Sequence, residues 1–242
     1  MKYSTVFFDL YGTLIDLHTD EQSDRAWEAL RDELHRNGAE YTSLTELRRA
    51  FADEEAALEM QEVGRPEHEI DLAPAYHNLF TLKGIAPSAD QIARAAWAFR
   101  DGSTDYIRLY DGAVELLDAL RAQGRRTVLL SNAQKLYTMP ELEKFSLAPH
   151  LDQIFISSEA GWKKPSEHFY TLGLKTAGAD ADHTLMVGND PQADMEGARR
   201  VGVDGAYLHT SDWFGDAPAA VQQFDGADYR GLLRFIEDSD RA

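Results

Sequence analysis

The stretch that decides the fold is Val6-Phe7-Phe8-Asp9-Leu10-Tyr11-Gly12-Thr13-Leu14-Ile15-Asp16. Its apolar run ends at a carboxylate and a glycine turn follows, which predicts a buried strand with Asp9 at its carboxyl-terminal end. Open parallel sheets bind ligands just beyond these strand ends. A carboxylate there can attack phosphorus or carbon and form a covalent intermediate. A lone Asp-x-x-Gly more often begins an ordinary turn, so the later segments decide between the two interpretations.

The composition limits the class of partner. The 242-residue chain carries 42 Asp and Glu against 24 Lys and Arg, a formal net charge of −18. Such a surface repels nucleic-acid backbones and anionic membranes, so neither is an expected partner. The lack of cysteine excludes disulfides and thiolate metal sites. Without an 18-residue apolar run or an amino-terminal signal pattern, we expect a cytoplasmic protein, monomer or homodimer.

Residues from about 20 to 105 have a helical character. Trp27, Leu30 and Leu34 lie three and four positions apart, which is the spacing of one helix face. Further helical patterns cover 44–60, 71–83 and 88–100, the last with Ser88 as its N-cap. This block contains no alternating strand pattern. The sequence therefore predicts a helical domain, residues 18–105, inserted into a core domain of residues 1–17 and 106–242.

Helices and strands alternate from about residue 107. This alternation implies right-handed crossovers and a parallel sheet covered by helices on both faces, an α/β, Rossmann-like core. Gly124 is placed to end the first of these helices. The predicted strands are 127–130, 153–156, 183–187 and 205–208, and the predicted helices are 112–123, 166–177, 194–201 and 229–237.

Polar residues follow three of the predicted strands. Asp9 ends the first, the pair Ser131-Asn132 follows another, and the segment 188–190 follows a third, with Asp194 four residues further on. Lys164 stands just before Pro165, where a helix is expected to begin. Taken singly, each residue is more often a turn, a cap or a solvated lysine. Their joint position at strand ends favours one functional site.

These segments together resemble the four motifs of the haloacid dehalogenase-like hydrolase superfamily. Residues 9–13 match its first motif, Ser131 its second, Lys164 its third and residues 188–194 its fourth. Gly197-Ala198 after the fourth motif and Phe169 after the third support the match. The motifs span residues 5–201, nearly the whole chain. The helical block then resembles the superfamily's type-1 cap.

The resemblance implies a role for each matched side chain. Asp9 is expected to be the nucleophile, and Lys164 to neutralise its charge and that of the transferring group. Thr13, Ser131 and Asn132 are expected to hold a substrate oxygen by hydrogen bonds. Mg²⁺, a hard cation that prefers oxygen ligands, is the expected cofactor.

The metal ligands are less defined than the nucleophile. The resemblance implies Asp9, the backbone carbonyl of Tyr11, and oxygens of the fourth motif. Aligned through Asp194, the usual first aspartate of that motif falls on Asn189, and Asp190 comes one place later. An amide carbonyl can bind Mg²⁺ but supplies no charge, so either residue can be the direct ligand.

Tyr11 departs from the pattern of the superfamily's phosphatases. They carry an aspartate here as general acid and base, whereas a tyrosine, with an ordinary pKa near 10, is a poor proton donor at neutral pH. Tyrosine here resembles the 2-haloacid dehalogenase branch, as does Tyr170, which we expect to contact the substrate as Tyr11 does. That branch, however, has serine and asparagine where this chain has Asn189 and Pro191. It also uses a cap arginine, for which Arg25, Arg31 and Arg36 are only candidates.

Three functions remain open. The first is a Mg²⁺-dependent phosphatase of a small phosphorylated metabolite, working through an aspartyl-phosphate at Asp9. The second is a metal-independent dehalogenase of short 2-halo acids, indicated by Tyr11 and Tyr170. The third is a binding protein that has lost catalysis and senses a phosphorylated metabolite.

Substrate selection is expected from the helical block. The polar segment 64–69 either forms a loop facing the cleft or is a solvated turn. Trp162 and Trp213 are expected to pack in the core rather than line the cleft.

Overall fold

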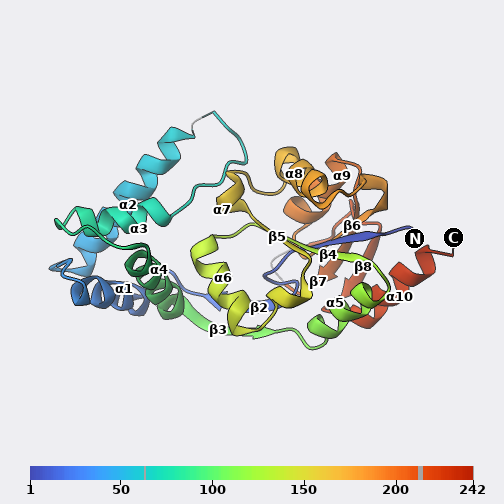
Figure 1. Ribbon diagram of the computed structural model, residues 1–242, viewed down its shortest axis with the longest axis horizontal. Coiled ribbons are helices and arrows are strands. Elements are labelled where there is room, and N and C mark those ends of the chain that lie inside the picture. Colours follow the sequence, from blue (N-terminus) through green and yellow to red (C-terminus); the bar gives the residue numbers. More distant parts are fainter. Residues whose placement is uncertain (63, 212–214, 242) are drawn as a thin grey trace.

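The core of the protein is a six-stranded sheet in which all neighbouring strands are parallel, in the order β5-β4-β1-β6-β7-β8 (Figure 1). The structure is a computed structural model and describes residues 1–62, 64–211 and 215–241, so Trp213 lies outside the described residues. The strands are β1 Thr5–Phe8, β4 Arg126–Ser131, β5 Gln153–Ile156, β6 Thr184–Gly188, β7 Asp204–His209 and β8 Gln222–Asp225. The predicted α/β fold with a parallel sheet is confirmed.

Helices cover both faces of this sheet, as Figure 1 shows, with α8 and α9 on one side and α5 and α10 on the other. Strand β1 is buried along its whole length because its side chains alternate between the two layers. Val6 and Phe8 pack in the cluster under α5 and α10, and Phe7 packs under α8. The core helices are α5 Ala113–Ala122, α6 Lys135–Lys144, α7 Ser157–Ala160, α8 Glu167–Ala177, α9 Gly197–Arg200 and α10 Tyr229–Ser239.

Four helices form a segment of their own, which we call the helical insert (residues 20–103). It contains α1 Asp24–Arg36, α2 Leu44–Gln61, α3 Ala73–Thr81 and α4 Ala89–Ser103. Their apolar faces build a separate hydrophobic cluster, to which the core contributes Tyr137 of α6. The N-cap expected at Ser88 is present and forms a capping box with Gln91.

Two short strands that the sequence analysis did not identify join the insert to the core. Strands β2 (Ile15–Thr19) and β3 (Thr104–Leu109) pair antiparallel, and the expected boundary positions 18 and 105 lie within them. Neither has the apolar run of a buried strand. Pairing is supported by a cross-strand ion pair, Asp16 with Arg108, and by a cross-strand hydrogen bond between His18 and Asp105.

The core differs from the expectation in three places. The helix expected at 194–201 begins earlier, as the π-helix η3 (Pro191–Glu196), and continues as α9. Strand β8 and helix α6 were not predicted; α6 contains Pro140 and has a weak amphipathic pattern. No helix within the described ranges combines the length and apolarity needed to cross a membrane.

Gly197 allows η3 and α9 to pack against the segment that follows Lys164. A Cβ at this position would lie 2.6 Å from Tyr170 Cε2 and 2.9 Å from the Pro165 backbone. We therefore expect Gly197→Ala to lower the free energy of unfolding by about 1–3 kcal/mol. Urea denaturation measures this. Gly215→Ala is the matched control, because nothing lies within 4 Å of its added methyl group; equal stability of the two variants would contradict the packing argument.

Candidate active site

The centre of the site is the ammonium group of Lys164. Its Nζ lies 2.6 Å from Asp9 Oδ1 and 2.7 Å from Asp194 Oδ1, and only 3% of the lysine is exposed. Asp9 follows β1, Lys164 precedes α8, and Asp194 lies in η3 after β6. Three segments that are far apart in sequence therefore meet at one point at the carboxyl ends of the strands.

Burial and charge oppose each other in this triad. Burial lowers the pKa of Lys164, but the Asp194 and Asp9 carboxylates outweigh it and hold the pKa above its ordinary value. Burial raises the pKa of Asp194, which Lys164 counteracts. Asp194 Oδ2 also accepts the Asp190 amide N–H at 2.9 Å. The two carboxylates thus favour the charged ammonium, which is held against the carboxylate of Asp9.

Two hydroxyl groups adjoin Asp9. Thr13 Oγ1 lies 3.5 Å from Asp9 Oδ2. Ser131 ends β4, the strand that pairs with β1, and its Oγ is buried with no hydrogen-bond partner among the described residues. Buried hydroxyls are nearly always bonded, so an unpartnered one at a strand end indicates a place for a ligand oxygen.

Asn132 and Tyr170 hold the backbone of the site. Asn132 accepts the Lys164 N–H at 2.7 Å and donates to the Lys164 carbonyl at 2.9 Å. The fully buried Tyr170 directs its hydroxyl to the carbonyls of Ala193 and Asp194, at 2.9 and 3.0 Å. The sequence analysis expected both to contact the substrate; the structure places their polar atoms on the main chain around Lys164 and Asp194.

The two remaining residues of the fourth motif differ in what they contact. Asp190 Oδ1 accepts the backbone N–H groups of Gln192 and Ala193, at 2.8 and 2.9 Å, and so caps η3. The Asn189 amide packs on the turn after Asp9, where a Cβ on Gly12 would lie 2.0 Å from its Nδ2. Among the described residues, no three His, Cys, Asp or Glu side chains are grouped to hold a metal ion.

Tyr11 turns away from the nucleophile. Its hydroxyl donates to Glu141 Oε2 at 2.5 Å and lies 3.1 Å from Thr138 Oγ1. Burial and the Glu141 charge raise its pKa well above the ordinary value. The guanidinium of Arg100, on α4, lies 5.4 Å from the Tyr11 ring.

The sequence analysis missed Arg100 and Glu141. Of its own arginine candidates, Arg25 bonds Asp105 and the backbone near it, while Arg31 and Arg36 contact Asp32 and Glu33 on their own helix. The available signal for Arg100 was an arginine on the buried face of α4, beside Ala96 and Phe99.

The segment 64–69 contacts the core near β5. The Glu69 N–H donates to the Gly161 carbonyl, and its Oε2 accepts Ser157 Oγ at 3.1 Å. Burial raises the pKa of Glu69. Trp162 is half-buried at the edge of the core and stacks on His168, with the Arg65 guanidinium 4.4 Å from its ring.

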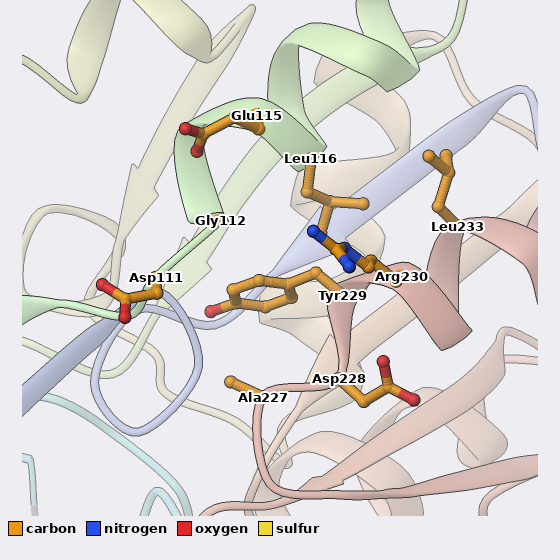
Figure 2. Close-up of a pocket in the computed structure, with 9 residues that line it drawn as sticks. All are labelled: Asp111, Gly112, Glu115, Leu116, Ala227, Asp228, Tyr229, Arg230 and Leu233. Carbon is orange, nitrogen blue, oxygen red and sulfur yellow. The ribbon is translucent and has the colours of Figure 1, made fainter.

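A surface pocket between α5 and α10 includes a residue that contacts the loop after β1. Figure 2 shows Tyr229 at the start of α10 with the other residues that line the pocket, which are Asp111, Gly112, Glu115, Leu116, Ala227, Asp228, Arg230 and Leu233. The Tyr229 hydroxyl donates to the Thr13 carbonyl at 2.5 Å. The pocket thus shares with the site only an anchor of the loop after β1.

One buried lysine thus lies between the carboxylates of Asp9 and Asp194, and comparison with known proteins identifies the class of protein that carries this arrangement. The family model of the haloacid dehalogenase-like hydrolases matches residues 3–202. The chain belongs to this family of hydrolases.

Relatives of known activity include phosphatases. The ribulose-1,5-bisphosphate 5-phosphatase of Halopiger xanaduensis is 29% identical over 48% of this chain, and the match spans about half of that protein, 48% of its length. The phosphoserine phosphatase of Thermus thermophilus is 32% identical over 41% of this chain and 40% of its own length. The phosphoglycolate phosphatase of Agrobacterium fabrum is 28% identical over 81% of this chain and 76% of its own length.

Solved structures of both branches share the fold. A 2-haloacid dehalogenase from Pseudomonas syringae superposes with a TM-score of 0.67 at 17% identity, covering 97% of this chain and 99% of that one. A HAD phosphatase from Thermococcus onnurineus superposes at 0.60 and 16% identity, covering 98% of each chain. At such identities the likeness shows the fold and does not separate the two reactions.

Removal of the Lys164 charge should make stability depend more steeply on pH. In Lys164→Met, Asp194 is buried beside Asp9 without a cation, so burial raises the pKa of Asp194 further above its value in the unfolded chain. The folded state then binds more protons, so its stability falls as the pH rises above about 4. We expect a loss of about 3–5 kcal/mol near neutral pH that shrinks in mild acid. Urea denaturation across this range measures it.

The exposed neighbour provides the control. Lys163→Met is the same substitution at an exposed position, and it leaves the contacts of Asp9 and Asp194 with Lys164 in place. A pH-independent loss in Lys164→Met, or an equal loss in both variants, would contradict the electrostatic account.

Proposed function

We propose that the enzyme is a Mg²⁺-dependent phosphatase of a small phosphorylated metabolite, acting through an aspartyl-phosphate at Asp9. The observation that carries the proposal is the Lys164 ammonium, 2.6 Å from the Asp9 carboxylate and buried with it. Phosphoryl transfer needs positioning and charge neutralisation more than covalent help from the protein, and this site supplies both. The phosphatases among the relatives support this choice of reaction.

Each step of the proposed phosphoryl transfer has a side chain of this protein that performs it. An Asp9 oxygen attacks phosphorus, its O–P bond forms, and the bond from phosphorus to the leaving oxygen breaks. Lys164 balances the negative charge of the carboxylate and phosphoryl oxygens, while Ser131 and Thr13 donate hydrogen bonds to those oxygens. Water then cleaves the acyl phosphate, which releases phosphate and restores Asp9.

The proposal narrows the metal donors to Asp9, the backbone carbonyl of Tyr11 and the Asn189 side-chain carbonyl. Asp190 and Asp194 are already committed to η3 and to Lys164. One carboxylate with neutral oxygens fits Mg²⁺, which keeps waters and shares its coordination with a substrate phosphate. When bound, the ion supplies further neutralisation of the phosphoryl charge.

The leaving group follows from Tyr11. Its hydroxyl is held by Glu141 and its pKa is raised, so it does not serve as the proton donor that alkyl phosphates need. Acyl or aryl phosphates, whose leaving groups depart without a proton, suit this site best.

We further propose that the helical insert, with residues 18–105, acts as a cap over the site. Gln134, three residues after Ser131, accepts the Leu72 N–H at 3.0 Å and donates to the Ile70 carbonyl at 2.8 Å. A cap held there excludes water from the reacting group and contributes to substrate selection.

A metal-independent 2-haloacid dehalogenase is the second candidate. Its supporting observation is again Tyr11, because halide leaves without a proton. Against it, Asn189 and Pro191 replace the serine and asparagine of that branch.

The substrate test compares acetyl phosphate, p-nitrophenyl phosphate and glycerol phosphate with Mg²⁺ present. We expect turnover of the first two and rates about 10²–10⁴-fold lower for the alkyl ester, because no group protonates its oxygen. Ser131→Ala should lower kcat about 10²-fold, and Asp9→Asn should abolish turnover. Release of phosphate measures all of these.

Two outcomes would redirect the assignment. Chloride release from 2-chloropropionate in EDTA, with no phosphate release, would establish the dehalogenase instead. No turnover of either kind by folded protein would favour a binding protein.

The metal assignment has its own test. Asn189→Asp adds a charge to the proposed donors and should lower the Mg²⁺ concentration for half-maximal activity severalfold. Asp190→Asn should leave it within about twofold, because that carboxylate caps a helix. Mg²⁺ titration of p-nitrophenyl phosphate hydrolysis distinguishes the two; a larger shift in Asp190→Asn would make Asp190 the ligand.

A further inference from the structure

A buried ion pair outside the four motifs joins the helical insert to the core. Arg100 on α4 donates from Nε to Glu141 Oε1 on α6 at 2.7 Å. The side chains are 7% and 1% exposed. Two charged groups taken out of water gain little net stability compared with apolar residues of the same size. The pair lies beside the first motif, which indicates a role other than stabilising the fold.

The second oxygen of Glu141 holds Tyr11. Tyr11 OH donates to Oε2 at 2.5 Å, so one carboxylate binds the insert with one oxygen and the nucleophile loop with the other. Arg100 also lies 5.4 Å from the Tyr11 ring and 5.3 Å from the Tyr137 ring, and its NH1 is 3.9 Å from Glu21. The remaining neighbour, Thr138 Oγ1, contacts the same tyrosine hydroxyl.

The loop transmits this constraint to Asp9 over a short distance. Tyr11 is two residues after Asp9, and the turn is closed by the N–H groups of Leu14 and Ile15, which donate to the Leu10 carbonyl at 2.8 and 2.9 Å. Gly12 follows with a φ of 77°. A tyrosine ring fixed on one side of so tight a turn restricts where the carboxylate on the other side can point.

We propose that Glu141 is a positioning residue that couples docking of the helical insert to the geometry of the loop bearing Asp9. When Arg100 is in place, Glu141 is neutralised and oriented to accept Tyr11. When the insert moves away, the buried carboxylate loses its cation and the grip on Tyr11 weakens. Glu141 touches no reacting atom. The inference rests on the proposed function only in taking Asp9 as the reacting group.

A double-mutant cycle tests the coupling. Arg100→Met removes the cation, and Tyr11→Phe removes the hydroxyl while it keeps the ring next to Arg100. With p-nitrophenyl phosphate and Mg²⁺, each variant should lower kcat about 10-fold or more with KM within about twofold, because a misplaced nucleophile slows the reaction more than binding. The double variant should be no slower than the worse single one, and in a Glu141→Gln background this non-additivity should vanish. Independent, multiplying effects in the parent background overturn the proposal.

Replacement of the ion pair by apolar residues distinguishes a positioning role from a purely structural one. Arg100→Met with Glu141→Leu removes both charges together, so folding should survive and the melting temperature should recover relative to Arg100→Met alone. We expect kcat to stay low, because Tyr11 has lost its acceptor. Recovery of parent kcat in this variant would show that the ion pair only stabilises the fold.

Hydrogen exchange provides a readout that needs no substrate. The Leu14 and Ile15 amides should exchange several-fold faster in Arg100→Met, although the mutated residue lies in the insert. The control is Glu67→Gln, which breaks the exposed pair of Glu67 with Arg200, 2.9 Å apart, another link between insert and core; it should change neither exchange nor kcat beyond about twofold. Unchanged exchange in Arg100→Met refutes the coupling. If exchange responds but no phosphate is hydrolysed, the coupling stands and the phosphatase assignment fails.

Discussion

The Lys164 ammonium between two buried carboxylates is the interaction on which the site depends. Asp9 and Asp194 are both buried, and two buried carboxylates so close together cannot both be ionised unless a cation lies between them. The three residues come from three segments, so their meeting requires β1 and β6 to be neighbours with parallel direction. A parallel sheet meets this requirement because it brings the carboxyl ends of its strands to one edge, where the charged residues can come together.

Three polar side chains around this triad bind main-chain atoms. Asn132 holds the backbone of Lys164, Tyr170 holds that of Asp194, and Asp190 caps η3. Such bonds orient the charged groups before any ligand arrives, which is how an electrostatic site avoids reorganisation during reaction. Only the Ser131 hydroxyl, among the described polar groups beside Asp9, is buried and left for a ligand.

How far the sequence predicts this arrangement depends on how local the signal is. Strands β1, β4 and β6 are apolar runs that end in polar residues, so both the strands and the residues at their ends could be predicted. Strands β2 and β3 could not, because their pairing relies on charges from opposite ends of the insert. The role of a residue was harder to predict than its position, because the residue type does not tell whether Asn132 or Tyr170 faces the substrate or the backbone. Glu141 lay on a helix, α6, whose own pattern is weak and contains a proline.

Tyr11 shows how one substitution changes the partners of a whole region. An aspartate at this position would stand beside Glu141 and repel it, whereas a phenol donates to that carboxylate and leaves its charge to Arg100. The buried ion pair therefore suits the tyrosine and disfavours an aspartate at this position. A site built in this way gives up a proton donor next to the nucleophile and gains a hydrogen bond to Glu141, which in turn binds Arg100 of the helical insert. That exchange suits a reaction whose leaving group departs as a stable anion, and in it the insert contributes to catalysis by holding the loop in place.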